Sequence, residues 1–219
     1  MLSDLAKVIY MVIDAIKKAL EKMDKRYCML STIDYHKLDE SFRENLSKYL
    51  ERPFAYEFYH QLRKLIDDGE VDFGGPIVQA EVDKRYQHCF RKGKIPDFII
   101  HIPNTNINLA VIEFKLTSNI SRIEEDFKKL VKFKQKRLNY EYLVEVIIDD
   151  CSCLKKAREH IKEISTDNGE KIIIVEFNTQ TWKADEWEIK YKPKSGKAES
   201  RMSANDIETR EPPEVKRRW

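Results

Sequence analysis

Three charged residues lie inside otherwise apolar segments: Asp97 in IPDFIIHI, and Glu113 and Lys115 in LAVIEFKL. Buried strands seldom carry charged side chains unless these have a partner or a chemical role. In a strand, residues two apart point to the same face, so Glu113 and Lys115 share a face while Phe114 points to the other. If the two segments pair about the polar turn PNTNIN, Asp97 lies opposite the region of Glu113.

Two carboxylates and an ammonium group would then meet at one end of two central strands. This combination is costly unless a cation compensates the carboxylates, and Mg²⁺ takes oxygen ligands while keeping several waters. Such an ion polarises a phosphoryl oxygen and lowers the pKa of a bound water, and a neighbouring lysine stabilises the charge that develops. The pattern favours Mg²⁺-dependent hydrolysis of phosphodiesters, with Mn²⁺ expected to substitute.

The pair Pro96-Asp97, followed by Glu113-Phe114-Lys115, resembles the signature of the PD-(D/E)XK nuclease superfamily. The resemblance implies that Asp97 and Glu113 bind the metal, that the backbone carbonyl of Phe114 is a further ligand, and that Lys115 is catalytic. It also implies a nuclease that acts on DNA in preference to RNA, in a prokaryotic restriction or defence setting.

The resemblance extends over residues 53 to 177, which would form a helix, three strands, a helix and a further strand. It implies a supporting catalytic glutamate on the helix before the sheet, and Glu57 is the matching position. Glu81 could reach the same site from the first strand, although an ordinary surface carboxylate is the better explanation of this residue.

Two runs of basic residues flank the proposed metal site in sequence and contain no acid. Phosphate binding is mainly electrostatic, so such runs are typical of a nucleic-acid-binding surface, although a solvated helix face explains the second run as well. The residues we expect to bind nucleic acid are Lys84, Arg85, Arg91, Lys92, Lys94, Lys128, Lys129 and Lys132.

Hydrophobic periodicity predicts the elements that must position these residues. Helices are expected at 4–23 (with Ser3 as N-cap), 39–50, 53–66, 120–137 and 153–165. Strands are expected at 76–87, 95–102, 109–116, 140–150, 171–179 and 187–192. The first three strands follow one another too closely for crossovers, so the sheet should be mixed.

The predicted fold class is therefore α/β, and the resemblance specifies a restriction-endonuclease-like mixed central sheet flanked by helices. Residues 1–50 are expected to form an N-terminal helical extension, and residues 51–192 the nuclease-like core. Residues 193–219 are polar and hold three of the seven prolines, so we expect a disordered tail.

The bulk composition fits one substantial domain of 219 residues, with 42% hydrophobic and 36% charged residues. No apolar run is long enough to span a bilayer, and the N-terminus lacks a signal-peptide layout. The four cysteines form no CxxC pair, so reduced thiols and a cytoplasmic location are expected. The net charge of +2 points to no particular partner, and a homodimer or a partner protein stays open.

Two other functions are compatible with the same residues. One is a non-catalytic member of the same fold that binds nucleic acid or protein. The other is an unrelated α/β adaptor whose polar tail is its working part. Metal binding separates them, because only the nuclease requires Mg²⁺ or Mn²⁺ at Asp97 and Glu113.

Overall fold

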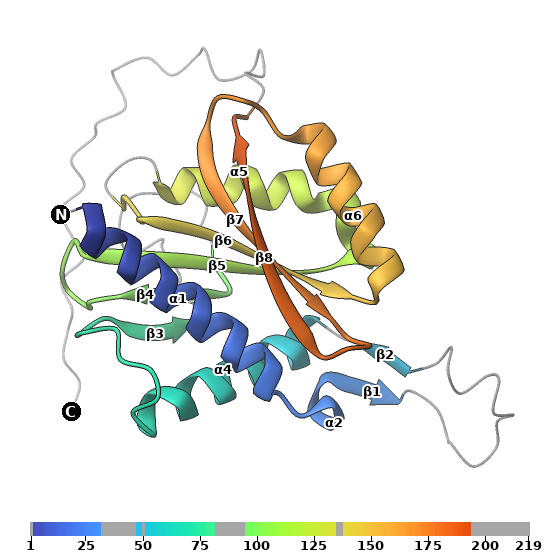
Figure 1. The fold of residues 1–219 in the computed structure, drawn as a ribbon, viewed down its shortest axis with the longest axis horizontal. Coiled ribbons are helices and arrows are strands. Elements are labelled where there is room, and N and C mark those ends of the chain that lie inside the picture. The colour runs from blue at the N-terminus through green and yellow to red at the C-terminus, as the bar shows by residue number, and fades with distance from the viewer. Residues whose placement is uncertain (1, 32–46, 50, 82–94, 135–137, 194–219) are drawn as a thin grey trace, which may run out of the picture.

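The computed structural model describes residues 2–31, 47–49, 51–81, 95–134 and 138–193 (Figure 1). They form a mixed α/β fold with a central sheet of six strands. In spatial order the strands are β3 (Ile77–Ala80), β4 (Phe98–His101), β5 (Asn108–Leu116), β6 (Tyr142–Asp149), β7 (Glu170–Asn178) and β8 (Lys183–Tyr191). The helices are α1 (Leu2–Lys22), α2 (Lys25–Cys28), α4 (Glu51–Asp67), the 3₁₀ helix η3 (Thr117–Arg122), α5 (Ile123–Lys134) and α6 (Cys151–Ile164).

The sheet is mixed, as the spacing of the strands predicted. β5, β6 and β7 are parallel, and every other neighbouring pair is antiparallel. A parallel pair needs a crossover connection, which α5 supplies between β5 and β6 and α6 supplies between β6 and β7.

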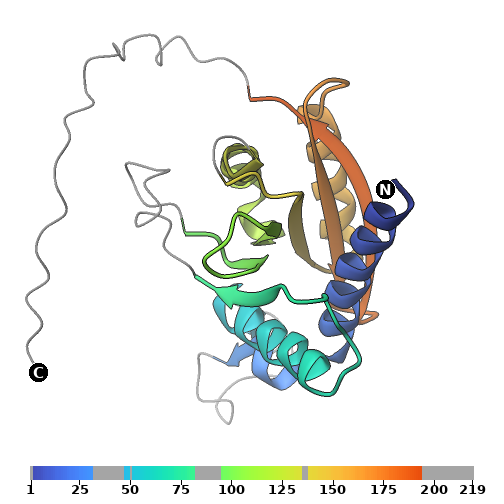
Figure 2. The same ribbon diagram turned by 90° about the vertical axis from the view of Figure 1, so that its left-hand side faces the viewer.

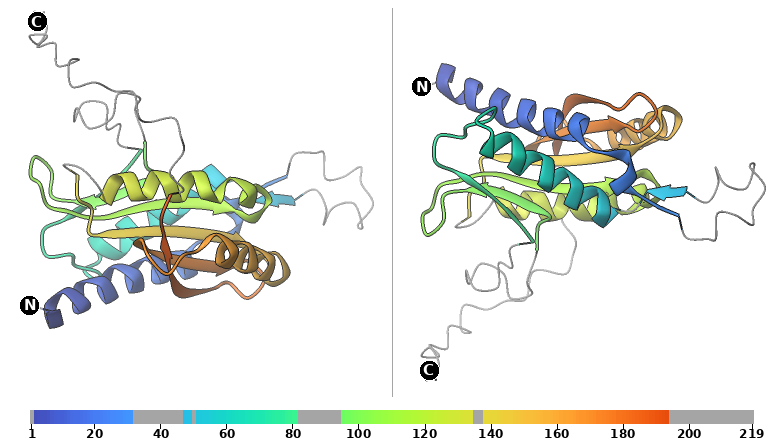
Figure 3. Two further views of the ribbon diagram at one scale, coloured as in Figure 1. Left: turned by 90° about the horizontal axis from the view of Figure 1, so that it is seen from above. Right: turned by 90° about the horizontal axis from the view of Figure 1, so that it is seen from below.

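Helices cover both faces of the sheet, so its central strands are almost wholly apolar. On one face, Phe98, Ile112 and Phe114 pack with residues of α1 and α4. On the other, Ile99 and Val111 pack with residues of α5 and α6. Figure 2 shows α1 and α4 outside the curved sheet, and in Figure 3 the views from above and below show α5 and the α1–α4 pair on opposite sides.

The N-terminal helix shares its core with α4 and the sheet. Ile16 and Leu20 of α1 are fully buried and belong to the same apolar cluster as Phe54 and Phe58 of α4. The indole Nε1 of Trp182, just before β8, donates a hydrogen bond to the carbonyl of Met23 at 3.0 Å. Among the described residues, no helix is both long and apolar enough to cross a membrane.

Two predicted elements differ from the observed ones. A helix was expected at 39–50, yet residues 47–49 form strand β2 (Ser47–Tyr49), antiparallel to β1 (Met29–Ser31). Pairing with a distant segment thus outweighed local helical spacing there, and 39–46 and 50 lie outside the described residues. Of the strand expected at 76–87, β3 covers Ile77–Ala80 and is interrupted at Glu81, which takes a left-handed backbone conformation with φ 47°, and 82–87 lie outside the described residues.

Other boundaries moved by smaller amounts. A 3₁₀ helix precedes α5, where a single helix from residue 120 was expected. β8 starts at Lys183, four residues before the expected start at 187, and pairs with β7 over its whole length. The segment 194–219, expected to form a tail, lies outside the described residues.

Candidate functional site

The pairing of β4 with β5 brings Asp97 and Glu113 together, as the hairpin arrangement predicted. Phe98 is the register partner of Ile112, so Asp97 lies opposite Glu113. The backbone N–H of Phe114 donates a hydrogen bond to Asp97 Oδ2 at 2.7 Å. Asp97 is therefore held against the second strand at the point where the charged residues occur.

The side chains of Glu113 and Lys115 lie on the face of the sheet that α5 covers, the face to which Val111 contributes. Two charged residues of α5 meet them there. Lys129 Nζ lies 2.6 Å from Glu113 Oε2, and Lys115 Nζ lies 2.6 Å from Asp126 Oδ2. Both pairs are largely shielded from solvent, since Glu113 is 3% exposed and Lys115 is 9% exposed.

A further carboxylate, which the sequence analysis missed, lies beside Glu113. Glu145 of β6 is the register partner of Glu113 and is completely buried. Among the residues that the structure describes, neither of its carboxylate oxygens has a hydrogen-bond partner, and neither does Glu113 Oε1. The sequence signal that identified Glu113, a charged residue inside an apolar strand, applies to Glu145 as well.

Burial, reinforced by the neighbouring carboxylates, raises the pKa values of the acidic side chains. Burial raises the pKa of Glu113 well above its usual range, and the charge of Asp97 adds to this, while Lys129 lowers it. Burial also raises the pKa of Glu145, with further contributions from Asp126 and Glu113. The pKa of Asp97 is raised by burial, against the hydrogen bond from Phe114. The site therefore favours an added positive charge, whether a proton or a cation.

Lys115 keeps its proton despite burial. Burial alone would lower its pKa, but the hydrogen bond and charge of Asp126, with the charges of Glu51 and Glu145, raise it above the ordinary value. The raised pKa favours the ammonium form, which stabilises nearby negative charge.

Glu51, the first residue of α4, reaches the site from the edge of the sheet. It lines a cavity of about 280 Å³ together with Asp97 and Glu81. Its Oε2 atom is buried with no hydrogen-bond partner in the described part of the chain, and its charge adds to the burial that raises the pKa of Asp97. Glu51 is thus the glutamate of the helix before the sheet that approaches Asp97.

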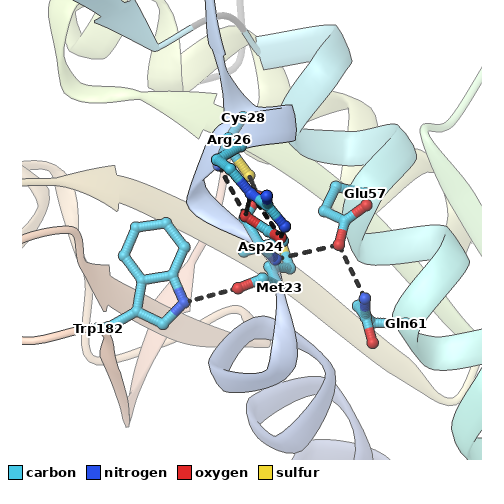
Figure 4. Close-up of polar contacts among 7 residues, drawn as sticks. All are labelled: Met23, Asp24, Arg26, Cys28, Glu57, Gln61 and Trp182. Carbon is cyan, nitrogen blue, oxygen red and sulfur yellow. Dashed lines mark hydrogen bonds and ion pairs between the residues drawn. The ribbon is translucent and has the colours of Figure 1, made fainter.

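Glu57, the glutamate expected in this role, lies elsewhere (Figure 4). Its Oε1 atom accepts hydrogen bonds from the backbone N–H of Asp24 at 3.0 Å and from Gln61 Nε2 at 2.8 Å. Six residues along an α-helix correspond to about 240° of rotation, so Glu57 faces the junction between α1 and α2 while Glu51 faces the cavity. The observed contacts give Glu57 a structural task, joining α4 to the end of α1.

The carboxylate oxygens of the site are ligands of the kind that a hard cation takes, and Glu113 Oε1 is one of those that are buried with no hydrogen-bond partner among the described residues. Among the described residues, however, the only three potential ligand atoms within 4.8 Å of one another belong to Asp149, Asp150 and Cys153. There Asp150 caps α6 by accepting from the N–H of Cys153 at 2.9 Å, which accounts for its position. Asp97, Glu113 and Glu51 would have to move closer together to share one ion.

The predicted nucleic-acid-binding lysines of α5 differ in their surroundings. Lys128 forms an ion pair with Glu124 at 3.4 Å, and Lys132 is partly buried. Lys129 points to Glu113 instead of outward. The other basic run lies outside the described residues; it consists of Lys84, Arg85, Arg91, Lys92 and Lys94.

The chain matches no protein-family model, and comparisons with curated proteins and with solved structures found no match. The arrangement of β4, β5, β6, α4 and α5 is therefore what any assignment of function must rest on.

Proposed function

We propose that this protein is a divalent-metal-dependent nuclease of the PD-(D/E)XK type, built on a restriction-endonuclease-like sheet and acting on DNA in preference to RNA. The observation that carries the proposal is the meeting of Asp97 and Glu113 across β4 and β5, with a charged Lys115 on the same face. The order of α4, the three strands, α5 and β6 supports it further.

Asp97 and Glu113 would hold Mg²⁺ or Mn²⁺, with the carbonyl of Phe114 as a further ligand and Glu51 in the supporting role first given to Glu57. When bound, the ion supplies Lewis-acid polarisation of the phosphate and a water of lowered pKa. The hydrogen bond from Phe114 N–H fixes one oxygen of Asp97, which leaves Oδ1 for a ligand.

Lys115 would stabilise negative charge on the scissile phosphate as the phosphorane forms. Its pairing with Asp126 at 2.6 Å holds the ammonium in place before substrate binds. Donors that are oriented in advance stabilise a developing charge without reorganisation during the reaction. Asp126 is accordingly a positioning residue for Lys115.

The ion pair between Lys129 and Glu113 favours a second candidate, a non-catalytic member of the same fold. In that case the ammonium of Lys129 is the permanent counter-ion of Glu113, and no metal is required. Under the nuclease proposal, Lys129 occupies this position only until a cation displaces it.

Cleavage and metal binding measured on the same variants would test the proposal. Purified protein is incubated with plasmid, linear DNA and RNA with Mg²⁺, Mn²⁺ or EDTA, and Mn²⁺ binding is followed by calorimetry. We expect metal-dependent cleavage that Asp97→Asn and Glu113→Gln abolish. Glu125→Gln, at an exposed residue of α5, is the matched control and should cleave normally. Parental cleavage by Asp97→Asn, or no Mn²⁺ binding by the parent, would refute the proposal.

A further inference from the structure

The cavity beside Asp97 is also lined by residues that have no part in the proposed metal site. Its lining includes Arg52 and Tyr56 of α4 and Ile95, which precedes β4. A volume of about 280 Å³ lies near the lower end of the range for small-ligand pockets, roughly 300 Å³. The lining of this cavity thus combines carboxylates with a basic side chain and with aromatic and aliphatic side chains.

Tyr56 exposes a large aromatic side chain at this cavity. It is 55% exposed, and no ring among the described residues packs against it. Tyr59, on the same helix, instead stacks on Phe98 with ring centroids 5.8 Å apart. Ile95 is also 44% exposed. Two exposed apolar side chains therefore line a cavity that also contains carboxylates.

Arg52 lies one helical turn before Tyr56, so the two side chains leave α4 on the same side. Within the described part of the chain, no carboxylate forms an ion pair with its guanidinium. An unpaired, exposed guanidinium suits a phosphate group, which it can bind through two parallel hydrogen bonds.

We propose that this cavity is a nucleotide subsite, which holds one unstacked nucleotide of a nucleic-acid strand beside the acidic centre. Tyr56 stacks on the base, Ile95 contacts it, and Arg52 binds an adjacent phosphate. The inference rests on the proposed function for the identity of the ligand. A base stacked inside a duplex cannot reach Tyr56, so the preferred substrate is single-stranded or has an unpaired end.

The test is a binding measurement that needs no cleavage. Fluorescence anisotropy in Ca²⁺ compares one oligonucleotide sequence as single-stranded DNA, single-stranded RNA and duplex DNA, and a 2-aminopurine base reports stacking. We expect single strands to bind more tightly than duplex. Tyr56→Ala should weaken single-strand binding about five-fold or more and abolish the 2-aminopurine quenching, whereas Tyr56→Phe should retain both.

Two further variants complete the test. Arg52→Gln should weaken binding and reduce its salt dependence, because one phosphate contact is lost. Tyr27→Ala, at a 65% exposed tyrosine of α2 that does not line the cavity, should bind as the parent does. The DNA and RNA arms show which sugar the subsite accepts. Equal binding by Tyr56→Ala and the parent, or equal affinity for duplex and single strand, overturns the subsite.

Failure of the subsite can be told apart from failure of the nuclease proposal. Mn²⁺-dependent hydrolysis of bis(p-nitrophenyl) phosphate, which carries no base, reports the metal chemistry alone. If the parent hydrolyses it and Tyr56→Ala still binds oligonucleotides normally, the subsite is wrong and the nuclease stands. If oligonucleotide binding depends on Tyr56 but no Mn²⁺-dependent hydrolysis of bis(p-nitrophenyl) phosphate is detected, the subsite is supported and the nuclease proposal is refuted.

Discussion

Glu113 and Glu145 lie side by side on parallel strands, and both are buried. Neighbouring carboxylates in a low-dielectric site cannot both ionise cheaply, so they share a proton or bind a cation. Lys129 supplies part of that positive charge through its ion pair with Glu113, whereas Lys115 forms its ion pair with Asp126. The chemistry of the site is therefore controlled by how this excess of acid is neutralised.

Glu145→Gln should stabilise the metal-free protein more at pH 8 than at pH 5. The folded-state pKa of Glu145 is raised above its ordinary 4.5, so its favourable contribution is present below that pH and is lost as the pH rises. Glutamine removes this loss. In EDTA, the melting temperature of the variant should exceed that of the parent at pH 8 by about 2 °C or more. If the difference in melting temperature between variant and parent were the same at pH 5 and pH 8, the raised pKa of Glu145 would be contradicted.

Lys129→Gln should bind Mn²⁺ several-fold more tightly than the parent. The ammonium lies 2.6 Å from Glu113 Oε2, where it competes with an incoming cation. Calorimetric titration measures the effect, and Lys128→Gln is the control because its ion pair with Glu124 lies apart from Glu113. Weaker Mn²⁺ binding by Lys129→Gln would show that this lysine does not compete with the metal.

Lys115→Ala separates binding from chemistry. The carboxylates remain, so Mn²⁺ affinity should change little, while cleavage should fall by about 100-fold or more through lost charge stabilisation. Calorimetry and a cleavage assay on the same preparation check both parts. Cleavage at the parental rate would show that the catalytic lysine is misassigned.

At the scale of elements, the site depends on where strands and helices begin and end. β4 and β5 set Asp97 opposite Glu113, β6 adds Glu145, and the start of α4 places Glu51 at the cavity. Asp97 directly precedes β4, whereas the other three residues lie within β5, β6 and α4, so four elements position the site. The turn between α6 and β7 packs closely against β8, because the backbone N–H of Thr166 donates a hydrogen bond to the carbonyl of Lys190 at 2.9 Å.

Gly169→Ala should destabilise the fold by more than about 1 kcal/mol. Gly169 has φ 147°, and a Cβ there would lie 2.3 Å from the carbonyl oxygen of Tyr191. Gly69→Ala is the comparison, because that glycine also has a positive φ but open space around it. Urea denaturation of both variants should show the larger loss at Gly169, and equal losses would mean that the close approach to β8 is easily relieved.

For the whole molecule, two apolar clusters lie on opposite faces of one sheet. The charged residues of β5 and β6 lie on the face covered by α5, while α1 and α4 stabilise the opposite face. The part of the chain expected to be an N-terminal extension thus contributes directly to the core through α1.

Ile16→Ala should reduce the free energy of unfolding by about 2–5 kcal/mol, because a fully buried side chain leaves a cavity. Tyr10→Ala, on the same helix at a 72% exposed position, should change it by less than about 0.5 kcal/mol. A single cooperative transition in urea is expected for both. If Ile16→Ala altered only a minor early transition, α1 would be a separable extension.

The sequence by itself determined the six main strands, the helices α1, α4, α5 and α6, and the meeting of Asp97 with Glu113. These follow from periodicity and from a short connection between adjacent strands, which are local properties of the chain. Only the tertiary structure decided that Glu51 approaches Asp97 in place of Glu57, that Glu145 joins Glu113, and that Lys129 turns inward. Those contacts depend on helix rotation and on pairing between strands that are distant in sequence, and a charged residue's type does not reveal which partner will bury it.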